Sequence, residues 1–131
     1  MARSIEPDDG TAVSILHLCY APRLRDMPLA EFRRLASPWT LAFLKRGTVV
    51  MGVAARKSGE LHIGILPQWR RRWATRGFIK DILRWAAESG PVTTGVMADN
   101  ATGRRLVEGV GFVLQDTTPQ GGRYALPAHA I

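Results

Sequence analysis

The segment "IGILPQWRRRWATRGFIKDILRWA", Ile63 to Ala86, joins an apolar strand-like run to a helical pattern through a proline and a basic loop. Pro67 ends the strand, because proline cannot donate a hydrogen bond to a sheet ladder. Apolar residues then recur at helical spacing, and this pattern predicts a helix from about Arg72 to Ser89 that stops at Gly90-Pro91. A long helix between two strands favours a right-handed crossover, so the strands on either side should pair in parallel.

The chain before this segment predicts an antiparallel meander. Three β-like runs are separated by the short connections "RGT" and "KSGE", which are typical of hairpins. Farther upstream, an apolar run is interpreted as a first strand, although its length also suits a short helix, and an amphipathic stretch with prolines predicts a helix. The predicted elements are a strand over Val13–Tyr20, a helix within Met27–Ser37, and strands over Trp39–Arg46, Thr48–Lys57 and Glu60–Leu66.

The chain after the segment completes the predicted fold. It indicates a strand at Val92–Asn100, a helix from Ala101 to Glu108 that ends at Gly109 or Gly111, and a hairpin of Gly111–Asp116 with Gly122–Leu126. The order β-α-β-β-β-α-β-α-β-β predicts an α+β fold with a central mixed sheet and helices on both faces. At 131 residues the chain has the length of one domain, so residues 1–131 are expected to form a single one.

Composition restricts the function classes. The formal net charge of +7 favours a polyanionic or phosphorylated partner. Cys19 is the single cysteine, which excludes an intrachain disulfide and fits a reducing compartment. The N-terminus lacks the apolar segment of a secretion signal, and no run reaches the roughly 18 apolar residues of a membrane span, so we expect a cytoplasmic protein without a membrane partner. His17, His62 and His129 show no metal-ligand spacing with Cys19, and no metal site is expected.

The basic loop after Pro67 is suited to binding phosphate. The first turn of a helix has unpaired amide N–H groups and a partial positive charge, and arginines add charge-assisted hydrogen bonds. A second interpretation stays open, in which the arginines only form a solvated basic surface. Nucleic-acid binding is a less favoured third one, because only Trp69 and Trp73 alternate with the charges and no nucleic-acid motif is present.

The element order, the quoted segment and the downstream segment "NATGRRLVEGVGF" together resemble the GNAT superfamily of N-acetyltransferases, which bind acetyl coenzyme A. The cofactor loop of that family has Gln or Arg, two variable residues, Gly, one variable residue, and then Gly or Ala. Arg70 matches the first position, whereas Trp73 and Thr75 stand at the two small positions. The Arg-Trp-x-Thr-Arg variant is similar to members encoded by phages and prophages.

The downstream segment matches the family more closely. Members often have an asparagine, then a leucine, and then Gly-Phe at a fixed spacing, which Asn100, Leu106, Gly111 and Phe112 keep without gaps. Many members also have a tyrosine directly after the leucine, and it protonates the departing thiolate. Val107 occupies that position here, so the usual general acid is missing.

The resemblance implies where the cofactor would bind. Loop amides and arginines would receive the pyrophosphate or the ribose phosphate, and the pantetheine arm would pair with the exposed edge of the strand before the loop, which splays from the strand after the helix. The cofactor-binding residues implied in this way are Ile63, Gly64, Ile65, Leu66, Arg70, Arg71, Arg72, Trp73, Ala74, Thr75, Arg76 and Asn100.

The implied reaction is direct attack of an amine on the thioester carbonyl, with a strand amide stabilising the developing oxyanion. A general base would deprotonate the ammonium form of the substrate. The candidates for this base are His62 and Glu60, which lie two residues apart on one strand face; Asp99 and Tyr124 are weaker candidates.

We therefore expect an N-acyltransferase that transfers an acetyl group from acetyl coenzyme A to an amine that the sequence does not identify. The alternative is a non-catalytic protein of the same fold, such as a phage-associated structural or interaction module. The reason for this alternative is that Trp73, Thr75 and Val107 depart from the family pattern. The acceptor pocket is expected between the first helix region and the final hairpin. Formation of a homodimer stays open.

Overall fold

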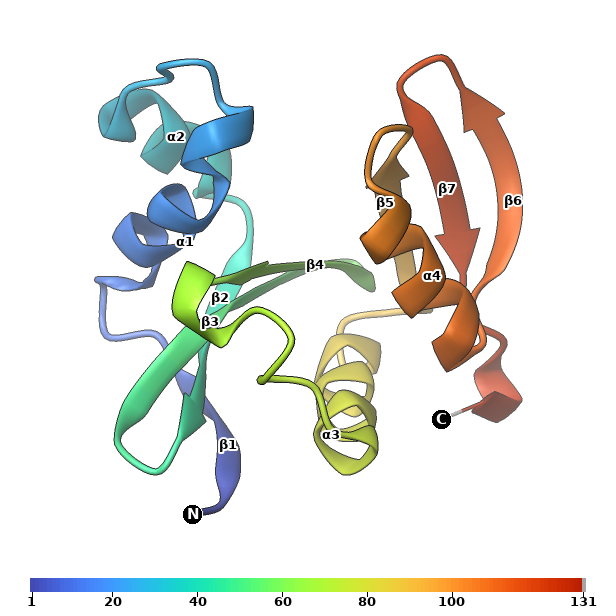
Figure 1. Ribbon diagram of the computed structural model, residues 1–131, viewed down its shortest axis with the longest axis horizontal. Helices are drawn as coiled ribbons and strands as arrows, with labels where there is room; N and C mark the ends of the chain where they lie inside the picture. Colours follow the sequence, from blue (N-terminus) through green and yellow to red (C-terminus); the bar gives the residue numbers. More distant parts are fainter. Residues whose placement is uncertain (131) are drawn as a thin grey trace.

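A computed structural model describes residues 1–130, and within them the chain forms a seven-stranded sheet with four α-helices (Figure 1). The strand order is β1-β2-β3-β4-β5-β7-β6, in which only the β4–β5 pair is parallel. The α+β fold with a mixed sheet is thus confirmed. The elements are β1 Arg3–Pro7, α1 Ala12–Tyr20, α2 Leu29–Ala36, β2 Thr40–Arg46, β3 Val49–Lys57, β4 Glu60–Ile65, α3 Arg76–Ala87, β5 Thr93–Met97, α4 Ala101–Val110, β6 Val113–Thr118 and β7 Gly121–Ala125, with 3-10 turns at Ala21–Arg23, Pro67–Trp69 and Ala128–Ala130.

The predicted first strand is wrong, because Val13–Tyr20 belongs to helix α1. The buried residues of this segment are Ala12, Val13, Leu16 and Cys19, a helical spacing that the neighbouring apolar but exposed Leu18 obscures in the sequence. The preceding acidic pair also favours a helix start, since the Asp8 carboxylate accepts hydrogen bonds from the amides of Gly10 and Ala12 at 2.8 and 3.0 Å. The true first strand is β1, which the sequence reading missed.

Strand β1 is a short edge strand that pairs antiparallel with β2, in a register that places Arg3 opposite Arg46 and Pro7 opposite Ala42. Pro7 is tolerated there because an edge strand leaves one row of backbone groups unpaired. The predicted meander is confirmed in β2, β3 and β4, and the hairpin is confirmed in β6 and β7. Strand β7, however, lies between β5 and β6, so β6 forms the second edge of the sheet.

Two apolar cores lie on opposite faces of the sheet, because successive strand residues point to alternate sides. In β2, Phe43 packs with α1 and α2, whereas Leu44 packs in the cluster that contains the apolar residues of α3. Gly64 of β4 lies directly beneath α1, and a Cβ there would approach Leu16 and Cys19 at 2.7 and 2.9 Å. Helices therefore cover both faces, as predicted, and α1 crosses β4 where β4 has no side chain.

Strands β4 and β5 are joined at one end only. Their parallel register consists of the single pair Glu60 with Thr93, and the Thr93 amide donates to the Gly59 carbonyl at 3.0 Å. Gly59 has φ of +86° and lies so close to Pro91 that no Cβ would fit. We call this region, Gly59–Glu60 with Pro91–Thr93, the closed end of the β4–β5 pair.

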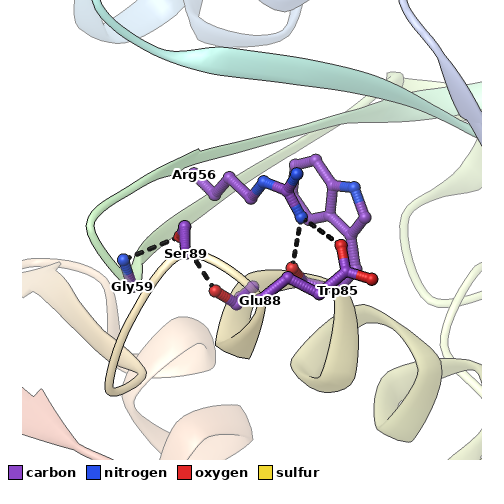
Figure 2. Close-up of polar contacts among 6 residues, drawn as sticks. Arg56, Gly59, Trp85, Glu88 and Ser89 are labelled. Carbon is purple, nitrogen blue, oxygen red and sulfur yellow. Dashed lines mark hydrogen bonds and ion pairs between the residues drawn. The ribbon is translucent and has the colours of Figure 1, made fainter.

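The end of α3 is fastened to the closed end by side chains of both elements (Figure 2). Arg56 donates from one guanidinium nitrogen to the Trp85 carbonyl at 2.5 Å and to the Glu88 carboxylate at 2.6 Å, and it also stacks on the Trp85 ring. The Ser89 hydroxyl accepts from the Gly59 amide at 2.8 Å and donates to the last turn of α3 at 3.0 Å. These contacts fix the point from which β5 leaves β4.

Candidate active site

Beyond the closed end, β4 and β5 diverge and the sheet opens. Figure 1 shows β1–β4 with α1 and α2 in one half of the molecule and β5–β7 with α4 in the other, with α3 lying below the divergence. The last direct link is a side chain: the buried Thr94 hydroxyl donates to the Leu61 carbonyl at 2.6 Å. We call the stretch beyond this bond, Ile63–Ile65 facing Gly95–Met97, the open end.

The backbone of β4 presents hydrogen-bonding groups toward the open end. Carbonyls of Gly59 and Leu61 face β5, because they accept from Thr93 and Thr94. Backbone groups of alternate residues point to the same strand edge, so those of Ile63 and Ile65 face the same way. No β5 residue pairs with them, since the ladder with β5 ends at Glu60. This edge can receive an extended ligand as an added strand.

A cavity of about 430 Å³ fills the open end. Its size is in the range of small-molecule sites, and its walls are mostly apolar. Of the residues predicted to bind a cofactor, Ile63, Trp73 and Asn100 lie in these walls. Other lining residues come from the end of α1 and the turn after it, from α3, and from α4 and the chain just beyond it; they include Tyr20, Arg23, Ile79, Leu106, Val107 and Phe112.

The basic loop makes a tight turn before α3. The amide of Arg72 donates to the carbonyl of Trp69 at 3.0 Å, Arg70 has φ −58° and ψ 134°, and Arg71 has φ +72°. These values describe a type II turn with Arg71 at the position that glycine normally occupies. A left-handed arginine is strained, and such strain is often stored at functional sites.

Helix α3 begins at Arg76, four residues later than the sequence predicted for its start at Arg72. The reason is the turn at Arg71 together with a capping residue, since the Thr75 hydroxyl accepts from the Phe78 amide at 3.2 Å. Because the helix starts late, a row of amides precedes its first hydrogen bond. Within residues 1–130, no hydrogen bond is formed by the amides of Trp73, Ala74, Thr75, Arg76 and Gly77.

The side chains of the loop divide into buried rings and exposed charges. Trp69 and Trp73 are 9 % and 8 % exposed and pack in the core cluster beside α3. The Trp73 ring, which stands where the family has glycine, therefore points into the core and forms part of the cavity wall. The guanidinium of Arg72 stacks on Trp69, 4.8 Å from the ring centre. In the described part of the chain, Arg70, Arg71 and Arg76 are exposed and form no ion pair, which leaves their charges free for an anion.

Asn100 and Val107 face the cavity from the other half of the molecule. Asn100 caps α4 by accepting from the Gly103 amide at 3.0 Å, and Gly103 leaves room for the amide group because a Cβ would overlap it. The donor NH₂ of Asn100 is not used in this cap. Val107 brings an apolar side chain to the wall, so α4 supplies no proton donor at the position where the resemblance placed one.

His62 and Glu60 lie together, as their spacing predicted. The His62 Nε2 is 2.6 Å from a Glu60 carboxylate oxygen, and the imidazole packs edge-on against Trp39. A carboxylate can only accept, so Nε2 carries the hydrogen, and in the neutral imidazole Nδ1 is then the nitrogen with the lone pair. A carboxylate that orients an imidazole in this way prepares the ring to accept a proton.

His62 also reaches a second hollow, of about 580 Å³, on the side of β5 that adjoins the final hairpin. His62 and Gly95–Met97 line both spaces. The far wall of the second hollow includes Asp116 and Arg123, paired at 3.2 Å, together with Thr118 and Gln120. The imidazole therefore lies between the cavity at the open end and a hollow with charged residues in its far wall.

The two weaker base candidates have other partners. Asp99 pairs with Arg23 at 3.4 Å, and Arg23 also contacts the Met97 sulfur at 3.2 Å, so these residues link the two halves across the cavity mouth. Tyr124 is buried and donates to Glu108 at 3.3 Å; burial and the Glu108 charge raise the pKa of its hydroxyl. Neither residue lines the apolar cavity.

Tyr20 and Arg3 are site residues that the sequence reading missed. Tyr20 ends α1 and brings a phenol to the cavity wall, where burial raises the pKa of its hydroxyl and keeps it protonated. Arg3, from β1, hydrogen-bonds to the carbonyls of Arg72 and Trp73 in the basic loop. A helix at Val13–Tyr20 would have suggested Tyr20 as a residue of the cavity wall. No feature of the sequence near Arg3 indicates its contact with the basic loop.

Residues 1–130 contain neither a candidate metal cluster nor a helix that could span a membrane. No group of three or more His, Cys, Asp or Glu side chains there could hold a metal ion. None of the helices in the same range has the length and apolar character needed to cross a membrane.

Comparison with known proteins identifies the fold. No protein-family profile and no curated protein matches the sequence. Solved structures do match: a proposed phosphinothricin N-acetyltransferase is 11% identical with a TM-score of 0.72, covering 95% of both chains. YncA, a proposed acetyltransferase from Salmonella typhimurium with its cofactor acetyl-CoA, is 16% identical with a TM-score of 0.66, covering 100% of this chain and 98% of that one.

A third match is a chimera of the spermidine N-acetyltransferase SpeG from Vibrio cholerae and hSSAT, at 14% identity and a TM-score of 0.66, covering 93% of this chain and 92% of that one. These three proteins differ from this chain at most positions but share its arrangement of elements over nearly the whole length. The chain therefore has the fold of the GNAT acetyltransferases.

Proposed function

We propose that this protein is an N-acyltransferase that takes an acyl group from acetyl coenzyme A and transfers it to an amine. The observation that carries the proposal is the open end of the β4–β5 pair, where an unpaired strand edge, an apolar cavity and a basic loop with free amides lie together. The likeness to acetyltransferase structures, one of them with acetyl-CoA, supports the same conclusion.

The residues present fit such a ligand at both of its ends. Unbonded amides from Trp73 to Gly77, the start of α3 and the exposed arginines would hold the pyrophosphate. The backbone edge at Ile63 and Ile65 would bind the amide-containing pantetheine arm, and the apolar wall would surround it. Thr75 caps the helix through its oxygen and keeps its hydrogen for a phosphate oxygen. The glycine replacements at Trp73 and Thr75 thus leave the phosphate-binding groups accessible.

Acetyl coenzyme A supplies a thioester, which an uncharged amine attacks with loss of the thiol. The protein then has to deprotonate the amine, orient it and stabilise negative charge on the carbonyl oxygen. His62, held by Glu60, is the proposed base, and an unpaired amide of Ile63 or Ile65 is the proposed oxyanion donor. Tyr20 carries a protonated hydroxyl in the wall and could return a proton to the thiolate in place of the missing tyrosine at Val107.

The acceptor amine is proposed to enter through the second hollow, beside the final hairpin. His62 faces this hollow as well as the apolar cavity, so an amine placed there would meet the base and the acyl group from the side opposite to the loop. The far wall with Asp116 and Arg123 suits a charged or hydrogen-bonding substituent on the amine. Arg23, in the turn after α1, and its partner Asp99 add charged groups at the mouth of the apolar cavity.

Titration with acetyl coenzyme A, followed by the heat of binding, tests the proposal first. We expect saturable binding of acetyl coenzyme A, and coenzyme A without the acetyl group should bind as well. The absence of binding at millimolar ligand would refute the cofactor assignment. Thiol release over a panel of primary amines then tests turnover. Binding without release from any amine would favour a non-catalytic protein, and the less favoured nucleic-acid interpretation predicts instead a salt-sensitive affinity for DNA or RNA.

A further inference from the structure

Arg3 makes a two-point contact with the basic loop. Its Nε donates to the carbonyl of Trp73 at 3.0 Å, and its Nη2 donates to the carbonyl of Arg72 at 2.9 Å. The two carbonyls are successive in the chain, and the donors belong to one planar guanidinium, which is a rigid fork. The contact spans 70 residues of sequence and joins the outermost strand, β1, to the start of α3.

The contact fixes the direction of two amides. In a trans peptide the N–H points opposite to the C=O, so the amide of Trp73 opposes the Arg72 carbonyl and the amide of Ala74 opposes the Trp73 carbonyl. Successive carbonyls of an extended chain point to opposite sides. Arg3 holds both carbonyls on one side because the backbone turns at Trp73, and both amides therefore point together, away from Arg3.

Two successive amides that point the same way form a concave nest, which binds anions. The amides of Trp73 and Ala74 have no hydrogen-bond partner within residues 1–130, so this nest is free to receive a ligand. In this loop the small residues that usually permit such a turn are absent, and the left-handed Arg71 just before it is strained. A fastening from outside the loop is therefore needed to hold the turn.

We propose that Arg3 is a positioning residue that holds the amides of Trp73 and Ala74 in line for the pyrophosphate of coenzyme A. The proposal rests on the proposed function and adds a residue of β1 to the cofactor site, through the loop and without contact to the ligand. Arg3 also brings its positive charge to the carbonyl side of the loop, so it offsets the repulsion that two parallel carbonyl dipoles would otherwise produce.

The test compares Arg3→Ala with wild type by calorimetry, using coenzyme A, dephospho-coenzyme A and pantetheine as probes. Coenzyme A and dephospho-coenzyme A both contain the pyrophosphate, and we expect about tenfold weaker binding for each, as one misaligned charge-assisted hydrogen bond would give. Pantetheine lacks the pyrophosphate, so its affinity should not change. The matched control is Arg46→Ala, which removes the same charge from the residue opposite Arg3 on β2, and it should bind all three probes as wild type does.

Three results would overturn the positioning role while leaving the proposed function intact: equal coenzyme A affinity in Arg3→Ala and wild type, an equal loss for pantetheine, or an equal loss in Arg46→Ala. If wild type itself fails to bind coenzyme A, the proposed function fails and this inference with it. Should Arg3→Ala not fold, Arg3→Lys carries the test. Lysine keeps the charge but not the planar fork, so we expect partial recovery, and full wild-type affinity would show that charge alone is sufficient.

Discussion

The closed and open ends of the β4–β5 pair use the same two strands for opposite purposes. At the closed end, Glu60 pairs with Thr93, glycine backbones approach closely, and Arg56 and Ser89 fasten α3 to the hairpin. At the open end, no strand pairing occurs, and a cavity separates the strands. An unpaired strand edge readily accepts a further strand or an extended ligand, which is why we propose the ligand site at this end.

The geometry of the open end depends on residues outside it. Strands β4 and β5 are held together at the closed end, and the basic loop is held by hydrogen bonds from Arg3 of β1. Side chains at the open end, such as His62 and Trp73, then occupy positions that those anchors determine. Substitutions at the closed end should therefore change stability, whereas substitutions at the open end should change binding or turnover.

Gly59→Ala should have the largest effect, because it breaks the closed end. A Cβ would overlap the Pro91 carbonyl, and φ of +86° is unfavourable for alanine. We expect a loss of about 2–5 kcal/mol in the free energy of unfolding, measured by urea denaturation with circular dichroism. The control is Gly109→Ala in α4, where no heavy atom lies within 4 Å; it should be neutral or stabilising by up to about 1 kcal/mol. Equal stability of the two variants would contradict the close packing of the closed end.

His62→Gln should have the largest effect on turnover at the open end. Loss of the base should lower the rate of thiol release by about a hundredfold near neutral pH, with coenzyme A affinity unchanged. The deficit should narrow as the pH rises, because the amine is then already uncharged. Glu60→Gln should cost less, since it removes only the group that orients the imidazole. A deficit that is independent of pH would argue against the role of His62 as the base.

Arg56→Met tests the fastening of α3 to the closed end. The change removes hydrogen bonds to the Trp85 carbonyl and Glu88, and we expect the free energy of unfolding to fall by about 1–2 kcal/mol. Glu88 is 65% exposed, so Glu88→Gln should cost less than about 1 kcal/mol. If the two variants were equally stable, the contact with the helix carbonyl would contribute nothing beyond the ion pair.

Arg71→Gly should separate stability from binding in the loop. Glycine relieves the left-handed strain at φ +72°, and after its own entropic cost we expect a gain of about 0.5–1 kcal/mol in thermal or urea unfolding. Coenzyme A affinity should fall because a free charge is lost. Arg70→Gln serves as the control, because Arg70 has an unstrained φ of −58°. This variant should weaken coenzyme A binding without any gain in stability. A stabilised Arg71→Gly with unchanged affinity would show that the charge at Arg71 is not used.

Cys19 reports on the packing of α1 behind the open end. Burial raises the pKa of its thiol from 9.0 to about 11, so the folded protein should react slowly with iodoacetamide at pH 8. Because the thiol of Cys19 has a higher pKa in the folded protein than in the unfolded chain, the buried neutral thiol stabilises the fold fully below pH 9. This stabilisation is lost as the pH rises to about 11. Cys19→Ser should flatten this pH dependence. Fast alkylation at pH 8 without unfolding would contradict the packing of α1 on β4.

The strands and helices from α2 onward could be predicted because the spacing of apolar residues, the glycine-containing turns and the prolines agree there. The region before α2 could not, because the apolar Leu18 is exposed and gives α1 a nearly continuous apolar run that also suits a strand. Strand β1 is stabilised by its pairing with β2, so its five residues show little of their structure in isolation. These misassignments come from tertiary contacts that override a weak local pattern.

For the candidate site, spacing predicted the contact of Glu60 with His62, which the structure confirms. The role of the loop from Arg70 to Arg76 stays a prediction from the resemblance, although the structure shows that Trp73 is buried and that Thr75 caps α3. Residues brought in from a distance were not predictable. Tyr20 lines the cavity because α1 folds across the sheet, and Arg3 reaches the basic loop because β1 is the outermost strand on that side.

Mapping amide chemical shifts on titration with coenzyme A shows whether the open end of the β4–β5 pair is the cofactor site. We expect the largest shifts at the free amides of Trp73 to Gly77 and at the strand edge, Ile63 and Ile65, with little change at the closed-end residues Gly59 and Thr93. Saturating shifts confined to other surfaces, or none at millimolar coenzyme A, would contradict this assignment.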